Sequence, residues 1–286
     1  MNYIYESIDQ ILRACEDHNC SFAEVVLRSE METYECSADS IYRGIDERLR
    51  IFEESIQEGL KNRDKTISGM SGGQGAQLLG HRPLILGDLA YKAMTYAILV
   101  NEANAKMFRI VACPTAGSCG ILPGCLQALK ETHELKQKDL RDGFLVAAGI
   151  GNVIMERACV GGCQAEVGTA AAMTAGAVTS ILGGTAQQIA SALALSLKNV
   201  LGLVCDPVAG LVEVPCVKRN GIFAVQALTA AELALGGIES QLPADQVIDA
   251  MNAIGRALPE ALRETSTGGL AVTPRAREIA QDLSDQ

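Results

Sequence analysis

The sequence contains no tryptophan, and aromatic residues supply only 4% of its 286 positions. A β-sandwich normally fills its core with aromatic and β-branched side chains, so this scarcity disfavours that fold. Glycine is abundant, with 28 residues, and hydrophobic residues make up 48% of the chain. This hydrophobic content excludes an intrinsically disordered chain, and the small side chains favour closely packed helices.

An excess of basic residues is also lacking. Lysine and arginine number 24 against 34 aspartates and glutamates, so the net charge is −10. A protein that binds nucleic-acid phosphates is expected to be basic, and we therefore expect no nucleic-acid partner. Residues 1–6 have neither the basic nor the apolar region of a secretory leader, which predicts a cytoplasmic protein. Its ten cysteines are then expected to be metal ligands, reactive groups or buried fillers rather than disulfides.

Charge is scarce between Phe144 and Leu197, where only Glu156, Arg157 and Glu166 are charged. The part from residue 167 to 197 is long enough to span a bilayer. However, glutamines, hydroxyl residues and a pair of glycines at 183–184 interrupt its centre. The segment therefore predicts two buried helices joined by a turn, and not a membrane span.

The remaining segments also favour helices. Apolar residues recur every three or four positions from Ile41 to Leu60, which predicts an amphipathic helix capped by Ser37 or Asp39. Further helices are predicted at about 88–106, from the loop at 113–120 to about 134, at 221–235 and 245–263, and at the C-terminal end. Glycines make residues 68–75 a loop, and residues 109–113 are predicted to be a short strand or an extended entry to a turn.

These patterns together predict an all-α protein with a single domain over residues 1–286. Its core helices are expected to be buried and rich in small residues, with glycine-rich loops at the active site. The first 65 residues or so are charged and amphipathic, and they predict a helical N-terminal arm.

Three cysteines lie beside helix-breaking residues. Cys163 follows two glycines, Cys205 precedes Asp206 and Pro207, and Cys216 follows a proline. Glycine and proline let a backbone approach a metal cluster and point N–H groups at sulfur. The spacing matches no compact metal finger, however, and three buried structural thiols explain it as well.

Five motifs, in a fixed order along the chain, favour the metal site over the three structural thiols. They are CPTAGSCGILP at 113–123, GCQAEVG at 162–168, NVLGLVCDPVAG at 199–210, VPC at 214–216 and RETSTGGLA at 263–271. Together they resemble the iron–sulfur L-serine dehydratases, and more narrowly the α subunit of the two-subunit bacterial form, over about residues 27–271. The resemblance implies that Cys163, Cys205 and Cys216 bind a [4Fe–4S] cluster. The implied reaction converts L-serine to pyruvate and ammonia through an aminoacrylate, without pyridoxal phosphate, as part of amino-acid catabolism and gluconeogenesis.

Three thiolate ligands suit this reaction because they leave one iron open to act as a Lewis acid. A base must also remove the proton on Cα. His81 and Lys198 are the local candidates, whereas His18 and His133 lie in polar segments; ordinary surface roles explain all four. The family carries a Ser-Ser-Ser-His-Thr motif in a separate domain that this sequence lacks. The resemblance therefore implies that a β subunit completes the active site of a heteromer.

Two loops are candidates for binding the substrate. Ser71, Gly72 and Gly73, and likewise Thr115 and Gly117, could offer hydroxyl and backbone N–H groups to a carboxylate or an amine. Ordinary turns explain both loops equally well.

Other residues of the motifs are expected near the same pocket. Asn199 is predicted to contact the substrate, Glu166 to lie beside the cluster ligands, and residues 265–269 to reach the pocket.

The other cysteines are not assigned to the cluster by the resemblance. They are Cys15, Cys20 and Cys36 in the polar arm, Cys113, Cys119 and Cys125 at six-residue intervals, and Cys159 one helical turn before Cys163. Single-chain members of the family end in a cysteine that caps the open iron, and this sequence ends in LSDQ. We therefore expect water, an anion or a partner group at that iron, and greater sensitivity to oxygen.

Two alternatives stay open at this point. A related lyase could act on L-threonine or on L-cysteine as a desulfidase, since one methyl group is discriminated by only about 1–3 kcal/mol. The chain could also be a non-catalytic metal protein, either a redox sensor or a zinc-stabilised scaffold.

Overall fold

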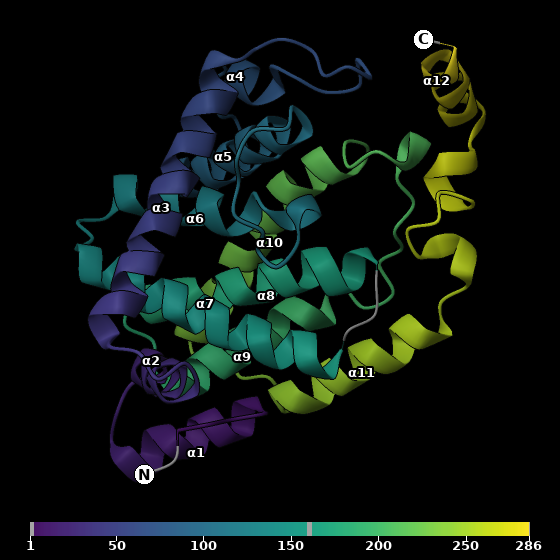
Figure 1. Ribbon diagram of the computed structural model, residues 1–286. Coiled ribbons are helices and arrows are strands. Elements are labelled where there is room, and N and C mark those ends of the chain that lie inside the picture. The colour runs from purple at the N-terminus through teal and green to yellow at the C-terminus, as the bar shows by residue number, and fades with distance from the viewer. Residues whose placement is uncertain (1–2, 159–161, 286) are drawn as a thin grey trace.

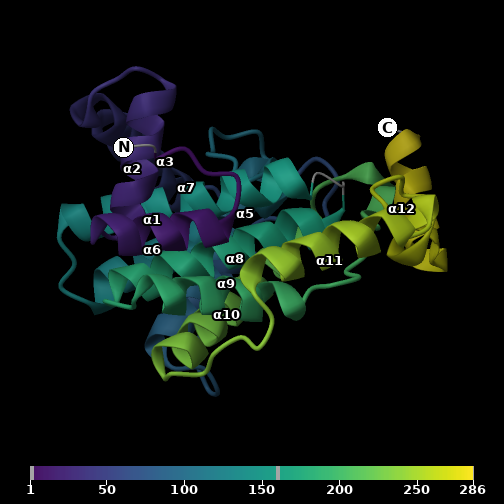
Figure 2. The same cartoon turned by 90° about the horizontal axis from the view of Figure 1, so that it is seen from below.

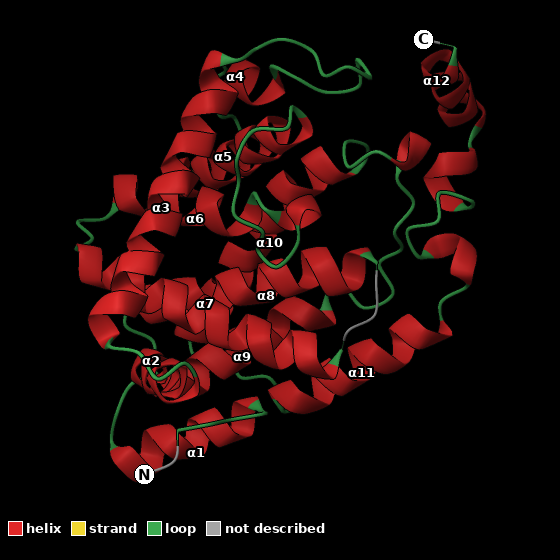
Figure 3. Ribbon diagram, in the orientation of Figure 1, coloured by secondary structure: helices red, strands yellow, loops and turns green. Residues whose placement is uncertain are grey.

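The structure is a computed structural model that describes residues 3–158 and 162–285. Within these ranges the chain forms twelve α-helices and four short 3-10 helices, without a β-strand (Figures 1 and 3). The all-α prediction is therefore confirmed. The α-helices are α1 Ile8–His18, α2 Phe22–Thr33, α3 Ala38–Lys61, α4 Gln74–Leu79, α5 Asp88–Ala105, α6 Ile121–Thr132, α7 Gln137–Arg157, α8 Cys163–Ile181, α9 Ala186–Lys198, α10 Cys216–Leu235, α11 Ala244–Ala257 and α12 Pro274–Ser284. The 3-10 helices are η1 Ala116–Ser118, η2 Val208–Gly210, η3 Glu260–Leu262 and η4 Gly269–Val272.

The uncharged segment forms two helices, as predicted. Helices α8 and α9 are separated by a short turn that contains the glycine pair at 183–184. Thr185 ends this turn: its hydroxyl accepts the N–H of Gln188, whose side chain accepts the N–H of Thr185 in return. Among the described residues, no helix is both long and apolar enough to cross a membrane.

Helix boundaries differ from the sequence-based prediction at three places. Helix α10 begins five residues earlier than predicted, at Cys216, and α11 ends at Ala257 instead of reaching residue 263. The early end follows from Pro259, because the residue before a proline is disfavoured in the helical conformation. Helix α4 begins at Gln74, inside the predicted glycine-rich loop. Of the two predictions for residues 109–113, the strand is not formed, and the segment leads into the turn at 113–115.

Small side chains let the core helices approach closely. Gly124 of α6 faces α5, where a Cβ atom would lie 2.6 Å from the backbone nitrogen of Ala97 and 2.7 Å from the carbonyl oxygen of Ala93. Any larger residue would therefore force these two helices apart. Helices α8, α9 and α11 run side by side along the body (Figure 2). The first helices join the same packing, since Ile8 and Ile11 belong to one apolar cluster with Val247.

A buried carboxylate holds the glycine-rich loop. Glu102 of α5 is fully buried, and its oxygens accept the backbone N–H groups of Gly72, Gln74 and Gly75 at 3.2, 2.9 and 3.3 Å. These donors include the start of α4, where a helix leaves its N–H groups without intrahelical partners. Because the side chain reaches the loop from the core, it ties the loop to the helical body.

Replacing Glu102 with alanine should destabilise the protein, because three backbone N–H groups would lose their acceptor. The expected loss is about 2–4 kcal/mol in the free energy of unfolding, measured by chemical denaturation and circular dichroism. Glu134→Ala, at an exposed position, is the control and should change little. An E102A protein as stable as the parent would contradict this role for the carboxylate.

Candidate functional site

The three cysteines of the family motifs lie at junctions between loops and helices. Cys163 is the first residue of α8 and Cys216 is the first residue of α10. The residue before Cys163 is Gly162, whose φ of 118° falls in a region that strongly favours glycine. Both helices begin on the side of the body where the C-terminal segment passes (Figure 1). The positive end of a helix dipole stabilises a thiolate placed there.

Cys205 lies in an extended stretch that pairs with the C-terminal segment. Its N–H donates to the carbonyl of Leu262 at 2.9 Å, and its carbonyl accepts the N–H of Glu264 at 3.0 Å. Glu264 reaches further, because its carboxylate accepts the N–H of Gly162 at 2.9 Å. The segment around residue 264 therefore connects the stretch of Cys205 with the start of α8.

Two of the predicted ligands meet directly. The sulfur atoms of Cys163 and Cys205 and a carboxylate oxygen of Glu166 all lie within 4.8 Å of one another. A hydrogen bond from the Cys205 thiol lowers the pKa of Cys163, and the charge of Arg219 lowers it further. The same hydrogen bond raises the pKa of Cys205, so that Cys163 is the first of the pair to ionise.

Cys216 does not belong to that group of three, but the charge of Cys163 affects its pKa. Burial, followed by the charge of Cys163, raises the pKa of the Cys216 thiol to about 12. Convergence of all three sulfurs on one cluster stays a prediction.

Arg219 links the three cysteine-bearing segments. It lies one helical turn after Cys216, and its Nη1 donates to the sulfur of Cys163 at 3.1 Å and to the carbonyl of Val204 at 3.0 Å. Its Nη2 donates to Asp206 at 3.2 Å, and the other oxygen of Asp206 accepts the N–H of Leu270 at 2.8 Å. One guanidinium thus contacts Cys163 and both neighbours of Cys205.

A pair of carboxyl groups borders the sulfur atoms. Burial raises the pKa of Glu166 to about 7, and the neighbouring charge of Glu264 and a hydrogen bond between the two carboxyl groups add to this shift. The Thr115 hydroxyl forms a hydrogen bond with Glu166 that acts in the opposite direction. Glu166 can therefore hold a proton near neutral pH. Glu264 is exposed, so this side of the site is open to solvent.

The loop that carries Thr115 and Gly117 is fixed by buried amides. Asn220, fully buried on α10, accepts the N–H of Gly120 at 2.9 Å and donates to the carbonyl of Gly117 at 2.8 Å. Asn101 of α5 also donates to that carbonyl at 3.2 Å. Thr115 is thereby brought to the carboxyl pair, while the carbonyl of Gly117 is occupied by these amides.

The other predicted substrate contacts have different surroundings. Ser71 is fully buried, and its hydroxyl has no hydrogen-bond partner among the described residues. The N–H of Gly72 already donates to Glu102, and Gly73 precedes the start of α4. Asn199 is exposed and its side chain donates to the carbonyl of Leu195 at 2.8 Å, which caps its own helix. No hydrogen bond among the described residues joins Asn199 to the three cysteines.

Residues 265–269 follow the segment that pairs with Cys205. The hydroxyls of Thr265 and Thr267 lie 2.8 Å apart and are exposed, whereas the Ser266 hydroxyl is buried and has no described partner.

The candidate bases lie elsewhere. His81 is exposed just after α4, the His18 ring packs against Tyr3, and His133 lies 2.9 Å from the Thr132 hydroxyl. Lys198 is the last residue of α9. Within the described ranges, no hydrogen bond or ion pair connects any of these four side chains to the site.

The remaining described cysteines are free thiols. Burial raises the pKa values of Cys113, Cys119 and Cys125, with that of Cys119 at about 12, so they stay protonated in the core. Cys15 is also buried, and Cys20 and Cys36 are partly exposed. Cys159 lies outside the described residues.

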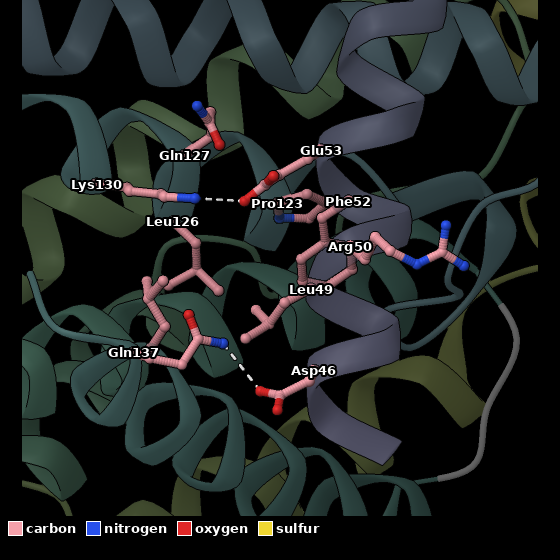
Figure 4. Close-up of a pocket in the computed structure, with 11 residues that line it drawn as sticks. Asp46, Leu49, Arg50, Phe52, Glu53, Pro123, Leu126, Gln127, Lys130 and Gln137 are labelled. Atoms are coloured by element: carbon pink, nitrogen blue, oxygen red, sulfur yellow. Dashed lines mark hydrogen bonds and ion pairs between the residues drawn. The ribbon is translucent and has the colours of Figure 1, made fainter. Parts of the chain in front are cut away.

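A cavity of about 180 Å³ between α3, α6 and α7 does not match this chemistry (Figure 4). Its polar groups are paired: Lys130 donates to Glu53, and Gln137 donates to Asp46 at 2.9 Å. The other lining residues are mainly apolar, and none is a cysteine. This cavity is therefore not the candidate site.

Several site residues were not identified from the sequence. Arg219 and Asn220 follow Cys216 by three and four positions, which places them on the same side of a helix. That signal was hidden because the helix was predicted to begin only at residue 221. Asp206 and Glu264 stand inside the motifs, but their partners come from distant parts of the chain and leave no local signal.

The metal-free protein should lose stability as the pH rises from about 4.5 to about 7. In this window the folded state binds a proton at Glu166 that the unfolded state has released, so rising pH favours unfolding. Glu166→Gln removes the titrating group and should raise the melting temperature at pH 8 but not at pH 4.5. Glu134→Gln serves as the control, and equal effects of E166Q at both pH values would contradict the prediction.

Comparison with known proteins agrees with the resemblance of the motifs. The family model described as "Serine dehydratase alpha chain" matches residues 17–271. The sequence is 41% identical over 287 residues to the probable L-serine dehydratase alpha chain of Bacillus subtilis, covering 98% of this chain and 95% of the relative. It is 39% identical over 281 residues to the L-serine dehydratase alpha chain of Peptoniphilus asaccharolyticus, covering 96% of each. It is also 52% identical over 204 residues to the probable alpha chain of Latilactobacillus sakei, covering 70% of this chain and 97% of the relative. The chain therefore belongs to the serine dehydratase alpha-chain family.

Proposed function

We propose that the chain is the metal-binding subunit of an L-serine dehydratase, which converts L-serine to pyruvate and ammonia. The observation that carries this proposal is the meeting of Cys163, Cys205 and Glu166, whose ligand atoms lie within 4.8 Å of one another. The names of the relatives add the substrate: the similar chain of Bacillus subtilis is named a probable L-serine dehydratase alpha chain, and that of Peptoniphilus asaccharolyticus an L-serine dehydratase alpha chain.

The donor set fits a [4Fe–4S] cluster. Cys163, Cys205 and Cys216 are buried free thiols, and iron–sulfur clusters are held by cysteine thiolates. The two helix N-termini and the Arg219 guanidinium supply positive potential where anionic sulfur would accumulate. When bound through three thiolates, such a cluster supplies an open iron that acts as a Lewis acid on an oxygen of the substrate.

The carboxyl groups of Glu166 and Glu264 are proposed to supply a proton. Loss of water from serine requires a proton for the departing hydroxide, as well as a base for the proton on Cα. The pKa of Glu166 is raised to about 7, so Glu166 can hand its proton to the hydroxide as the C–O bond breaks. The Thr115 hydroxyl orients Glu166 for this transfer. The aminoacrylate that results becomes an imine, and water converts the imine to pyruvate and ammonia.

A second chain is needed for the base. None of the described histidines is hydrogen-bonded to the site, and the similar chains are named alpha chains, which implies a beta chain beside them. The exposed position of Glu264 leaves an open side at which a partner could complete the pocket. We therefore propose that a β chain provides the base that removes the proton on Cα.

Anaerobic purification with the β chain should give protein with bound iron and acid-labile sulfide that forms pyruvate from L-serine. Cys205→Ala should abolish both the bound iron and pyruvate formation, because a ligand is lost. Cys125→Ala removes a buried thiol outside the site and is the matched control, expected to keep both. A fully active C205A protein would overturn the assignment.

The same preparation separates the alternatives. We expect pyruvate from L-serine at a higher kcat/KM than 2-oxobutyrate from L-threonine or sulfide from L-cysteine. A preference for L-cysteine would identify a desulfidase instead, and zinc without acid-labile sulfide would identify a non-catalytic metal protein.

A further inference from the structure

We propose that Arg219, anchored by Asp206, is the positioning residue of the metal centre. It holds the three cysteine-bearing segments at fixed positions relative to one another, and its positive charge lies beside the sulfur of Cys163. This inference rests on the proposed function, since it concerns the thiols assigned to the cluster. It adds a residue that the motifs of the sequence did not point to.

The first argument is the reach of the guanidinium. Arg219 is carried by the helix that begins at Cys216, and it contacts the sulfur of Cys163 and the residues on either side of Cys205. A movement of any one segment would therefore break a hydrogen bond to this side chain. The planar fork of arginine makes these contacts in three directions, and the single ammonium of lysine cannot reproduce their geometry.

The second argument is the cost of burying the pair. The side chains of Arg219 and Asp206 are 14% and 4% exposed, the least exposed of the ion pairs between described residues. A buried ion pair seldom stabilises a fold by itself, because desolvation offsets the attraction. A contact with an anionic sulfur gives this arginine a use that a purely structural pair would not have.

The third argument is the way in which Asp206 is held. One of its oxygens accepts from Arg219, and the other accepts the N–H of Leu270 at 2.8 Å. Gly269 approaches so closely that a Cβ there would lie 2.5 Å from the Asp206 carboxylate. Asp206 is thus fixed by the C-terminal segment and in turn fixes the direction of the guanidinium.

A cation beside a ligating sulfur has an expected effect on the metal centre. Hydrogen bonds and positive charge at cysteine sulfur favour the more reduced state of an iron–sulfur cluster and raise its reduction potential. Groups that orient metal ligands also contribute to affinity, and their loss typically costs about 10–100-fold. Arg219 should therefore affect both the retention of iron and the reduction potential.

The test compares Arg219→Met, Arg219→Lys and Asp206→Asn in the anaerobically purified complex with the β chain. Arg141→Met is the matched control, because Arg141 forms a partly buried ion pair with Asp46 between α7 and α3. For each protein, iron and sulfide content, iron loss to a chelator and the midpoint potential from an EPR-monitored titration are measured. Far-UV circular dichroism establishes that each variant is folded.

We expect R219M to bind iron about 10–100-fold more weakly than the parent and to have a more negative midpoint potential. R219K should keep most of the potential but lose iron faster, because it keeps the charge without the fork. D206N should fall between the parent and R219M, and R141M should match the parent.

The proposal is overturned if folded R219M has the iron affinity, EPR spectrum and midpoint potential of the parent. If R219M does not fold, parent-like behaviour of both R219K and D206N overturns it equally. A parent complex without iron or acid-labile sulfide would instead refute the proposed function itself, so the two failures are distinguishable.

Discussion

The ionisable groups around Cys163 shift one another's pKa values. The Cys205 thiol and the Arg219 guanidinium lower the pKa of Cys163, while burial and the neighbouring Glu264 raise the pKa of Glu166 to about 7. Each group would be costly to bury in the charged state alone, because desolvation penalises an isolated ion. The guanidinium, the two sulfur atoms and the Glu166 carboxyl group therefore lie together in one site, and the surrounding loops must hold them at contact distance.

Those loops are held by polar side chains that extend from buried helices. Glu102 of α5 binds the glycine-rich loop through backbone N–H groups, and Asn220 of α10 binds the loop that carries Thr115. Glu213, just before α10, accepts the hydroxyls of Thr66 and Ser68 at 2.7 and 2.8 Å. The glycine-rich loop is therefore connected to the segment that leads into Cys216. These irregular segments are thus positioned by hydrogen bonds to side chains of the helical core.

The sequence was sufficient for the fold class because helical periodicity is a local property. The cap at Ser37, the two helices from the uncharged segment and the long helix α5 all follow from residues within one or two turns. Less of the candidate site could be predicted from the sequence. The motifs identified Cys163 and Cys205, but the contacts of Arg219 with Cys163 and of Glu264 with Gly162 join residues 56 and 102 positions apart. No periodicity records such pairs, and the early start of α10 concealed Arg219 as a neighbour of Cys216.

The pairing of Cys205 with residues 262–264 sets an order of events during synthesis. Cys163 leaves the ribosome about 100 residues before Glu264, the residue whose carboxylate receives the N–H of Gly162. Until the later segment emerges, the extended stretch around Cys205 lacks its backbone partners, and Asp206 lacks the N–H of Leu270. The backbone around Cys163 and Cys205 can therefore form these hydrogen bonds only after residues 262–270 have been synthesised.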